Sequence, residues 1–321
     1  MTEFELIRRF FTHRTPGTAL GVGDDAALLR VTRGNELAVS ADMLVAGRHF
    51  LAKADPALLG HKSLAVNLSD MAAMGARPRW ATLALALPGI DEKWLAAFAR
   101  GFISIARRFK VDLVGGDTTR GPLTISVQIM GEVPTGKALR RDGARAGDDI
   151  WVSGHLGAAA MALDLVGRGK RIDPNVRREL EQRLHAPTPR VALGIALRGV
   201  AHSAIDVSDG LLADLGHICE RSELGAAVHW EAIPAIPAVR AYAQSDRGAR
   251  CLLAGGDDYE LCFTASRRQR ATVVRAAARA RVGVTLVGEV TRRVGRRAPV
   301  VLLDSVGRPL KVRVRGYDHF R

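Results

Sequence analysis

Aspartates in small-residue turns are the residues of this sequence best suited to chemistry. Six short segments combine Asp with Gly, Ser or Ala, at residues 23–27, 40–43, 67–71, 115–119, 205–210 and 255–260. A single Asp beside Gly ordinarily makes a turn or caps a helix, and Asp209 fits the cap position well. Six such segments in a chain of net charge +14 are harder to explain as independent turns. We interpret them as parts of an acidic site.

Clustered carboxylates without His or Cys favour a hard cation. Mg²⁺ prefers oxygen ligands, retains waters, and commonly binds through a few carboxylates together with substrate phosphates. Asp70 strengthens this interpretation, because it stands in an otherwise apolar helical stretch where a charged residue needs a partner or a metal. No HExxH motif or Cys/His cluster is present, so we do not expect zinc.

The familiar phosphate-binding motifs are missing from the sequence. There is no GxxxxGK[ST] loop, no protein-kinase motif set and no GxSxG elbow. Residues 21–26 formally match the GxGxxA dinucleotide turn, but Asp24 and Asp25 fill the place where a pyrophosphate would approach the backbone. The sequence therefore excludes a P-loop enzyme and disfavours a dinucleotide fold.

Composition limits the cellular compartments and the partners that we expect for this chain. The start of the chain does not resemble a signal peptide, and no stretch of 18 apolar residues exists, so we expect no membrane span. The chain has three cysteines, an odd number, and no two of them have CxxC spacing. We therefore expect no disulfide framework, and this fits a reducing cytoplasm. Arginines are spread over many segments without interleaved aromatics, so we expect no specific nucleic-acid site despite the basic charge.

Alternating patterns predict two mixed α/β domains, residues 1–140 and 141–321, within the 321-residue chain. The Gly- and Arg-rich stretch 134–148 is the expected boundary. Helices are expected at 56–75 (with Asp55 as N-cap), 91–108, from about 156, at 190–198 and at 209–221, with an Arg-rich amphipathic helix before residue 282. Strands are expected at 111–114, 123–130, 150–153, 204–207, 259–265 and 282–287.

In their order along the chain, the acidic motifs resemble those of the thiamine-monophosphate kinases, a family related to aminoimidazole-ribonucleotide synthetase and selenophosphate synthetase. The matching motifs are GDDAA, VSADMLVAGRHF, KSLAVNLSDMAAMGA, LVGGDTTRG, AIDVSDGLLADL and GGDDYEL. The resemblance runs from about residue 21 to residues 316–320. It implies an α/β (α+β) fold whose N-terminal sheet forms a barrel across a homodimer, with the nucleotide between the domains and its phosphates bound through Mg²⁺.

The resemblance also implies roles for individual residues. The implied metal ligands are Asp24, Ser40, Asp42, Asp70, Asp117, Asp206 and Asp209. The implied nucleotide contacts are Gly116, Asp117, Arg141 and Ser208, and the implied thiamine contacts are His49, Asp257 and Tyr317. Three positions depart from the family. Ala41 stands where many relatives have Thr, Asp257 where relatives often have Glu, and Arg100 where some relatives put a Tyr, so Arg100 is left out of the site.

By this resemblance, the activity is ATP-dependent phosphorylation of thiamine monophosphate to thiamine diphosphate. The acceptor is a phosphate monoester whose second pKa is about 6, so it is largely dianionic at pH 7 and needs no general base. Several Mg²⁺ ions are the implied cofactors, and a monovalent cation is a possible further one. The Mg²⁺ ions would offset the repulsion between ATP and the acceptor phosphate and would align direct in-line transfer. No catalytic side chain is implied.

Three alternatives stay open. Another ATP-using enzyme of the superfamily is the nearest, although a selenophosphate synthetase would normally carry a reactive Cys or selenocysteine near its N-terminus, and the first cysteine here is Cys219. A non-catalytic basic nucleic-acid-binding protein predicts salt-sensitive duplex binding but leaves the acidic segments unexplained. A homologue that binds thiamine phosphates without turnover has some support from Ala41.

Overall fold

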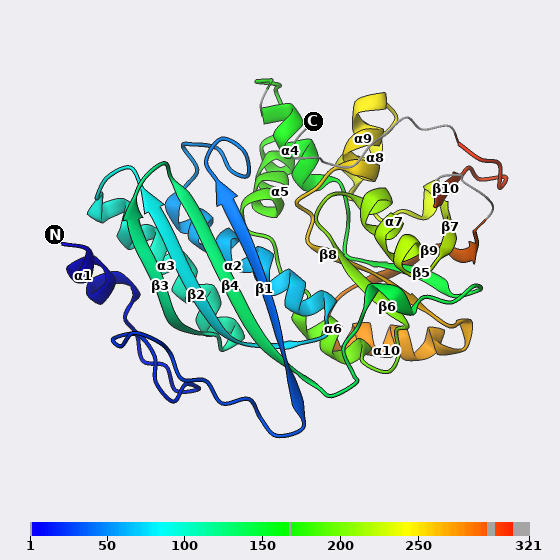
Figure 1. Cartoon of the computed structure of the whole chain (residues 1–321). Helices are drawn as coiled ribbons and strands as arrows, with labels where there is room; N and C mark the ends of the chain where they lie inside the picture. The colour runs from blue at the N-terminus through cyan, green and yellow to red at the C-terminus, as the bar shows by residue number, and fades with distance from the viewer. Residues whose placement is uncertain (1, 167, 294–298, 311–321) are drawn as a thin grey trace. The chain divides into compact units, whose positions relative to one another are not determined.

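The structure is a computed structural model that describes residues 2–166, 168–293 and 299–310 (Figure 1). The chain divides into two compact units. One consists of Met1–Met71 with Ala76–Gly136, and the other of Ala72–Gly75 with Lys137–Arg321. Each unit contains one sheet and several helices, so the predicted mixed α/β class is confirmed. Within the described ranges, no helix combines the length and the apolar character needed to cross a bilayer.

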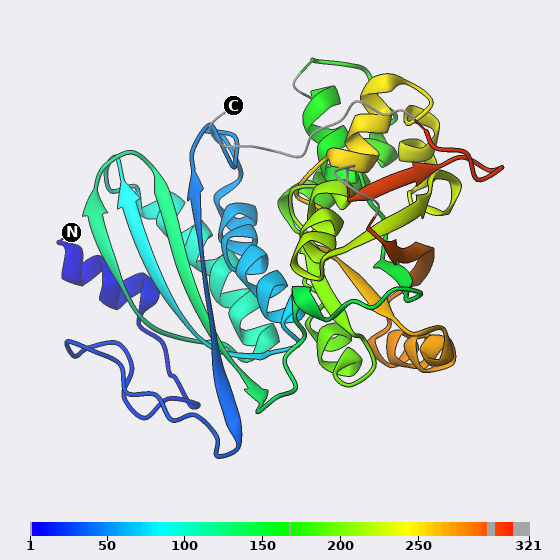
Figure 2. The same ribbon diagram turned by 45° about the vertical axis from the view of Figure 1, so that its right-hand side comes forward.

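The first unit is built on a four-stranded sheet in the order β1-β4-β2-β3. Strand β4 runs antiparallel to β1 and β2, and β2 and β3 are parallel. Helices α2 and α3 cover one face of this sheet (Figure 2). The elements are α1 (Glu3–Leu6), the π-helix η1 (Ile7–Phe11), β1 (Asn35–Val45), α2 (Pro56–Ala73), β2 (Arg77–Leu87), α3 (Glu92–Phe109), β3 (Asp112–Arg120) and β4 (Thr124–Pro134).

The two helices begin where their capping residues predict. The Asp55 carboxylate accepts the N–H groups of Ala57 and Leu58, at 2.8 and 3.0 Å. Asp91 caps α3 in the same manner. Each carboxylate satisfies backbone donors that have no partner inside the helix. The predicted helices at 56–75 and 91–108 are therefore confirmed.

Strand β3 is longer than the sequence suggested. The expected strand ended at residue 114, before the glycine pair, whereas β3 continues through Gly116 and Asp117 to Arg120. The reason is close backbone packing, because a Cβ atom on Gly116 would lie 1.8 Å from the Leu83 carbonyl oxygen. Glycine here continues the strand against β2 instead of ending it.

The second unit holds a six-stranded sheet in the order β10-β7-β9-β5-β8-β6. Among its described residues, strands β10 and β7 pair in parallel and the other ladders are antiparallel. Its elements are η2 (Arg141–Gly143), β5 (Asp149–Ser153), α4 (Ala158–Val166), α5 (Pro174–His185), α6 (Val191–Leu197), β6 (Ser203–Val207), α7 (Leu211–Arg221), β7 (Leu224–His229), η3 (Trp230–Ala232), α8 (Pro237–Tyr242), α9 (Asp246–Ala254), β8 (Glu260–Ala265), η4 (Arg267–Gln269), α10 (Arg270–Ala280), β9 (Val284–Arg292) and β10 (Val300–Leu303).

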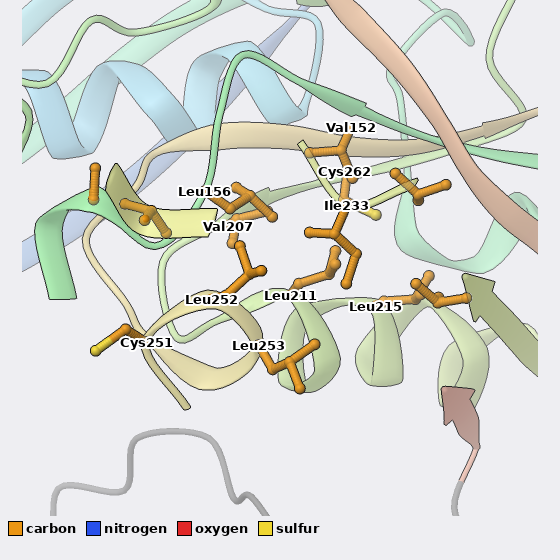
Figure 3. Close-up of a cluster of buried hydrophobic side chains, with 14 of the residues drawn as sticks. Val152, Leu156, Val207, Leu211, Leu215, Ile233, Cys251, Leu252, Leu253 and Cys262 are labelled. Carbon is orange, nitrogen blue, oxygen red and sulfur yellow. The ribbon is translucent and has the colours of Figure 1, made fainter. Parts of the chain in front are cut away.

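One core cluster of the second unit joins its strands to α7 and α9. Figure 3 shows Val152 and Val207 from strands lying near Leu211 and Leu215 of α7. All four side chains are fully buried. Complete burial of a branched aliphatic side chain stabilises a fold by about 1.5–3 kcal/mol. The core therefore holds the end of β6 and the start of α7 in place, and the segment between them carries predicted site residues.

The start of α7 contradicts one expectation. Asp209 was expected to cap this helix, but the helix begins after Gly210, and the cap position makes no side-chain hydrogen bond. Gly210 adopts a φ of +110°, and a Cβ atom there would lie 2.5 Å from Ala254 Cα. This glycine conformation shifts the helix start by one residue, so the capping role predicted for Asp209 is wrong.

Candidate functional site

Three of the predicted metal-binding residues meet between β1 and α2. Ser40 and Asp42 are two residues apart on β1, so they point to the same side of the strand. The Ser40 hydroxyl donates a hydrogen bond to Asp70 Oδ2 at 2.6 Å. Burial, followed by the charge of Asp70, raises the pKa of Asp42 to about 7. Two carboxylates this close favour a shared proton or a cation between them.

Asp24, Gly116 and Asp117 meet elsewhere in the first unit. They line a cavity of about 520 Å³. The lining also includes Phe4 and Ile7, from the helical segment at the N-terminus. Sequence analysis considered this segment only as a signal peptide, although apolar residues three apart indicate a helical face. The N-terminal wall of the cavity was therefore missed.

These two groups lie far apart within one sheet. The pairing register places four residues in one row across the strands: Asp42, Val127, Leu83 and Gly116. Three strand spacings separate the ends of the row, which is about 14 Å. In the part of the chain that the structure describes, no three His, Cys, Asp or Glu side chains gather closely enough to hold a metal ion. Neither group by itself brings together three such side chains among the described residues.

In the second unit, two of the acidic segments lie side by side. Ser208 and Asp209 form the turn between β6 and α7, and Asp206 is buried in β6. The Asp257 N–H donates to the Ser208 carbonyl at 2.9 Å. Asp257 has a left-handed backbone with a φ of 70°, and its carboxylate accepts the Tyr259 hydroxyl at 2.9 Å. The predicted metal and thiamine residues of this unit therefore share one backbone framework.

Asp214 belongs to the same framework and was not predicted. Its Oδ2 atom accepts the N–H groups of Ser208, Asp209 and Gly210 at 3.1, 3.0 and 3.0 Å. Burial raises the pKa of Asp214 to about 7, while the three backbone donors favour the carboxylate. A charged residue inside the apolar run LLADL was the available signal, and the same signal had drawn attention to Asp70.

Three remaining residues have separate positions. Arg141 is exposed, and its carbonyl accepts the Ser222 hydroxyl beyond the C-terminal end of α7. Eleven helical residues, about 16 Å, separate that end from the Ser208 turn. His49 follows β1, and its Nδ1 accepts the Val45 N–H at 3.0 Å. Tyr317 lies outside the described residues.

The comparisons with known proteins agree over nearly the whole chain. The N-terminal and C-terminal domains described as AIR synthase related protein match residues 23–133 and 145–300. The thiamine-monophosphate kinases of Salmonella typhimurium and Escherichia coli are each 43% identical to this chain, over 99% of it and 98% of their own length. The chain belongs to the thiamine-monophosphate kinase family.

Solved structures of thiamine-monophosphate kinases resemble this chain in fold. The crystal structure of thiamine-monophosphate kinase from Stenotrophomonas maltophilia K279a is 47% identical and matches with a TM-score of 0.84, covering 93% of this chain and 94% of that one. A complex of AaThiL with AMPPCP and TMP is 28% identical and matches with a TM-score of 0.78, covering 99% and 96%. The family membership inferred from the acidic motifs is confirmed.

Proposed function

We propose that this chain transfers the γ-phosphoryl group of ATP to thiamine monophosphate and forms thiamine diphosphate. Full-length identity to kinases of that name supports the proposal, as does the match to a structure that holds AMPPCP and TMP. The observation that carries it within the molecule is the Ser40–Asp42–Asp70 cluster, because it gathers oxygen donors that a hard cation prefers. Purified protein incubated with ATP, Mg²⁺ and thiamine monophosphate, with the product identified by mass, tests it directly.

The donor atoms of the predicted metal residues fit Mg²⁺. They are carboxylate and hydroxyl oxygens, the ligands that a hard cation prefers. When bound, Mg²⁺ neutralises the charge that builds up between the two polyanions. The residues proposed to hold it are Asp24, Ser40, Asp42, Asp70, Asp117, Asp206 and Asp209. A partial ligand set in each place is compatible with this ion, since substrate phosphates and waters supply further ligands.

The remaining polar residues bind and orient the substrates. Gly116, Arg141 and Ser208 are proposed to contact ATP. Asp257 offers its carboxylate to the cationic thiazolium of thiamine, and the Tyr259 hydroxyl holds that carboxylate in place. No residue needs to remove a proton, because the acceptor phosphate is already largely dianionic at pH 7. In direct transfer the protein therefore contributes by binding the two substrates and aligning them.

We propose that the first units of two chains close a barrel in a homodimer. The face of β1 that points away from Ser40 and Asp42 carries apolar side chains, and Leu37, Val39 and Met43 are 44%, 52% and 58% exposed. Such a stripe on an edge strand is typical of an interface. If β3 of one copy lies beside β1 of the other, Asp117 approaches the partner's Asp42. Within one sheet the two residues cannot meet, because about 14 Å separates Asp42 from Gly116 across the strands.

Subunit mixing tests this shared site. Asp42→Asn changes the β1 side, and the double variant Asp24→Asn/Asp117→Asn changes the β3 side. In a mixture with random exchange, half of the dimers are hybrids and each hybrid has one intact site, so about a quarter of wild-type activity should return. Sites contained within single chains would leave the mixture as inactive as its components, and the shared site would then be rejected.

Two further properties belong to this proposal. A cytoplasmic location suits the three cysteines, which are all buried and free. Another ATP-using reaction of the superfamily is the remaining candidate activity. It is distinguished in the same mass assay, because ATP would then be consumed without formation of thiamine diphosphate.

A further inference from the structure

In the turn between β6 and α7, the backbone N–H groups donate to a side chain of the protein itself. Amide groups at the start of a helix are ordinarily left without partners and attract anions, including phosphate. Here the N–H groups of Ser208, Asp209 and Gly210 all point to one oxygen of Asp214. Asp214 is only 3% exposed, so the protein's own carboxylate occupies these donors.

The other side of the turn is held as firmly. The Ser208 carbonyl accepts the Asp257 N–H, and the Val207 carbonyl accepts the Tyr259 N–H, both at 2.9 Å. Gly210 packs against Ala254 so closely that no side chain fits there. Asp214 therefore completes a turn whose carbonyl side is tied to the segment 255–259, and the half-buried Ser208 and Asp209 side chains project from that fixed backbone.

We propose that Asp214 is a positioning residue of the phosphoryl-transfer site. It touches neither substrate. It fixes the direction of the Asp209 carboxylate and the Ser208 hydroxyl, and it removes three anion-binding amides from the turn. The turn thereby selects a cation, and the substrate phosphates are held through that cation. The role in transfer rests on the proposed kinase function, whereas the preference for a cation is a property of the turn itself.

Two variants separate geometry from charge. Asp214→Asn keeps an oxygen that can accept backbone N–H groups but removes the negative charge, and Asp214→Ala removes both. We expect Asp214→Ala to need about tenfold more Mg²⁺ for half-maximal activity, and Asp214→Asn to need a smaller increase because it keeps an acceptor oxygen. The KM for thiamine monophosphate should change by less than about twofold in both. Asp214→Ala should also become sensitive to inorganic phosphate as an inhibitor, because three amide donors are released.

A matched control separates positioning from loss of stability. Asp149 is a buried acid of the same unit that holds Arg270 through two hydrogen bonds, at 2.6 and 2.8 Å. Asp149→Asn should lower Tm without changing the Mg²⁺ requirement. If the Asp214 variants lower Tm and keep the wild-type Mg²⁺ requirement and phosphate tolerance, Asp214 is merely structural and the proposal is overturned.

A binding measurement keeps this test independent of activity. Electron paramagnetic resonance of Mn²⁺ with the full chain and ADP reports bound cation directly. Weaker Mn²⁺ binding in Asp214→Ala, comparable with that in Asp209→Asn, supports the proposal even if the kinase assay fails. Unchanged Mn²⁺ binding in Asp214→Ala beside weaker binding in Asp209→Asn refutes it, even if the protein phosphorylates thiamine monophosphate.

Discussion

Two acidic places in this molecule use the same side chain in opposite ways. At β1 and α2, burial and, after it, the charge of Asp70 raise the pKa of Asp42. At the start of α7, Asp214 faces three backbone donors that favour its carboxylate form, although burial raises its pKa. A carboxylate facing another carboxylate is prepared for a cation, and one facing amides is part of the scaffold. The partner of each Asp therefore decides its role.

The largest expected effect is on turnover, at the Asp42–Asp70 pair. Asp42→Asn, and separately Asp70→Asn, should lower kcat by about a thousandfold or more, because charge at the metal is lost where it neutralises transferring phosphate. Steady-state assays at saturating ATP and Mg²⁺ measure the loss. Asp112→Asn is the control, since Asp112 lies in the first unit and instead binds Gly17 and Thr18. If both pair variants keep activity within threefold of wild type, the pair does not belong to the site.

A smaller effect is expected at the residues proposed to contact thiamine. Asp257→Asn and Tyr317→Ala should each raise the KM for thiamine monophosphate about tenfold, equivalent to about 1.4 kcal/mol of binding, because a charge or an aromatic face for the thiazolium is lost. The KM for ATP should barely change. Initial rates over both substrate concentrations separate the two constants. A change in the ATP constant alone would mean that the thiamine pocket lies elsewhere.

Asp42, buried beside Asp70, should also cost stability when no metal is present. Its folded-state pKa of about 7 exceeds the ordinary 3.8, so folding favours the protonated acid. The cost is absent below pH 3.8, grows as pH rises to about 7, and is full above that, at most about 4 kcal/mol. Asp42→Asn lacks this cost. Its Tm in EDTA should therefore exceed that of wild type by a few degrees at pH 8 and by less at pH 5.

Two controls limit the interpretation of that stability measurement. Asp24→Asn changes an exposed acid of the same unit and should follow wild type at both pH values. Saturating Mg²⁺ should narrow the gap between Asp42→Asn and wild type, because the cation stabilises the pair in the native protein. A gap that is constant from pH 5 to pH 8 would show that the pKa of Asp42 is not raised in the folded protein.

The smallest expected signal is the absence of a covalent intermediate. Neither acidic place requires a protein nucleophile, so transfer should be direct. Incubation with γ-labelled ATP and Mg²⁺, without acceptor, should leave the protein unlabelled after denaturation. A labelled protein that passes its phosphoryl group to thiamine monophosphate would contradict direct transfer, and the labelled residue would then have to be mapped.

Local patterns predicted most of the helices and the membership of the family. Capping residues such as Asp55 and Asp91 act within one turn, so their effect can be read directly from neighbouring residues. The motif order, from GDDAA to GGDDYEL, extends over most of the chain and identified the family. The predicted Ser40–Asp42–Asp70 grouping also meets in space, although its parts are 30 residues apart in the sequence.

The errors arose where distant backbone contacts decide local structure. Gly116 looked like the end of a strand, because its close approach to Leu83 depends on pairing with β2. Asp209 looked like a helix cap, but the contact between Gly210 and Ala254 shifted the helix start. Asp214 was missed for a related reason, since its three donors become visible only when the turn is folded. Sequence patterns report the local preference for a helix, strand or turn. At these positions tertiary packing determines the backbone conformation instead.

The strand register that separates Asp42 from Gly116 has a genetic consequence. If every site combines the β1 edge of one chain with the β3 edge of another, a chain carrying Asn at positions 24, 42 and 117 spoils both sites of any dimer it joins. Such an allele should be dominant negative when expressed beside the wild-type gene. The phenotype would follow from a spacing of about 14 Å across one sheet.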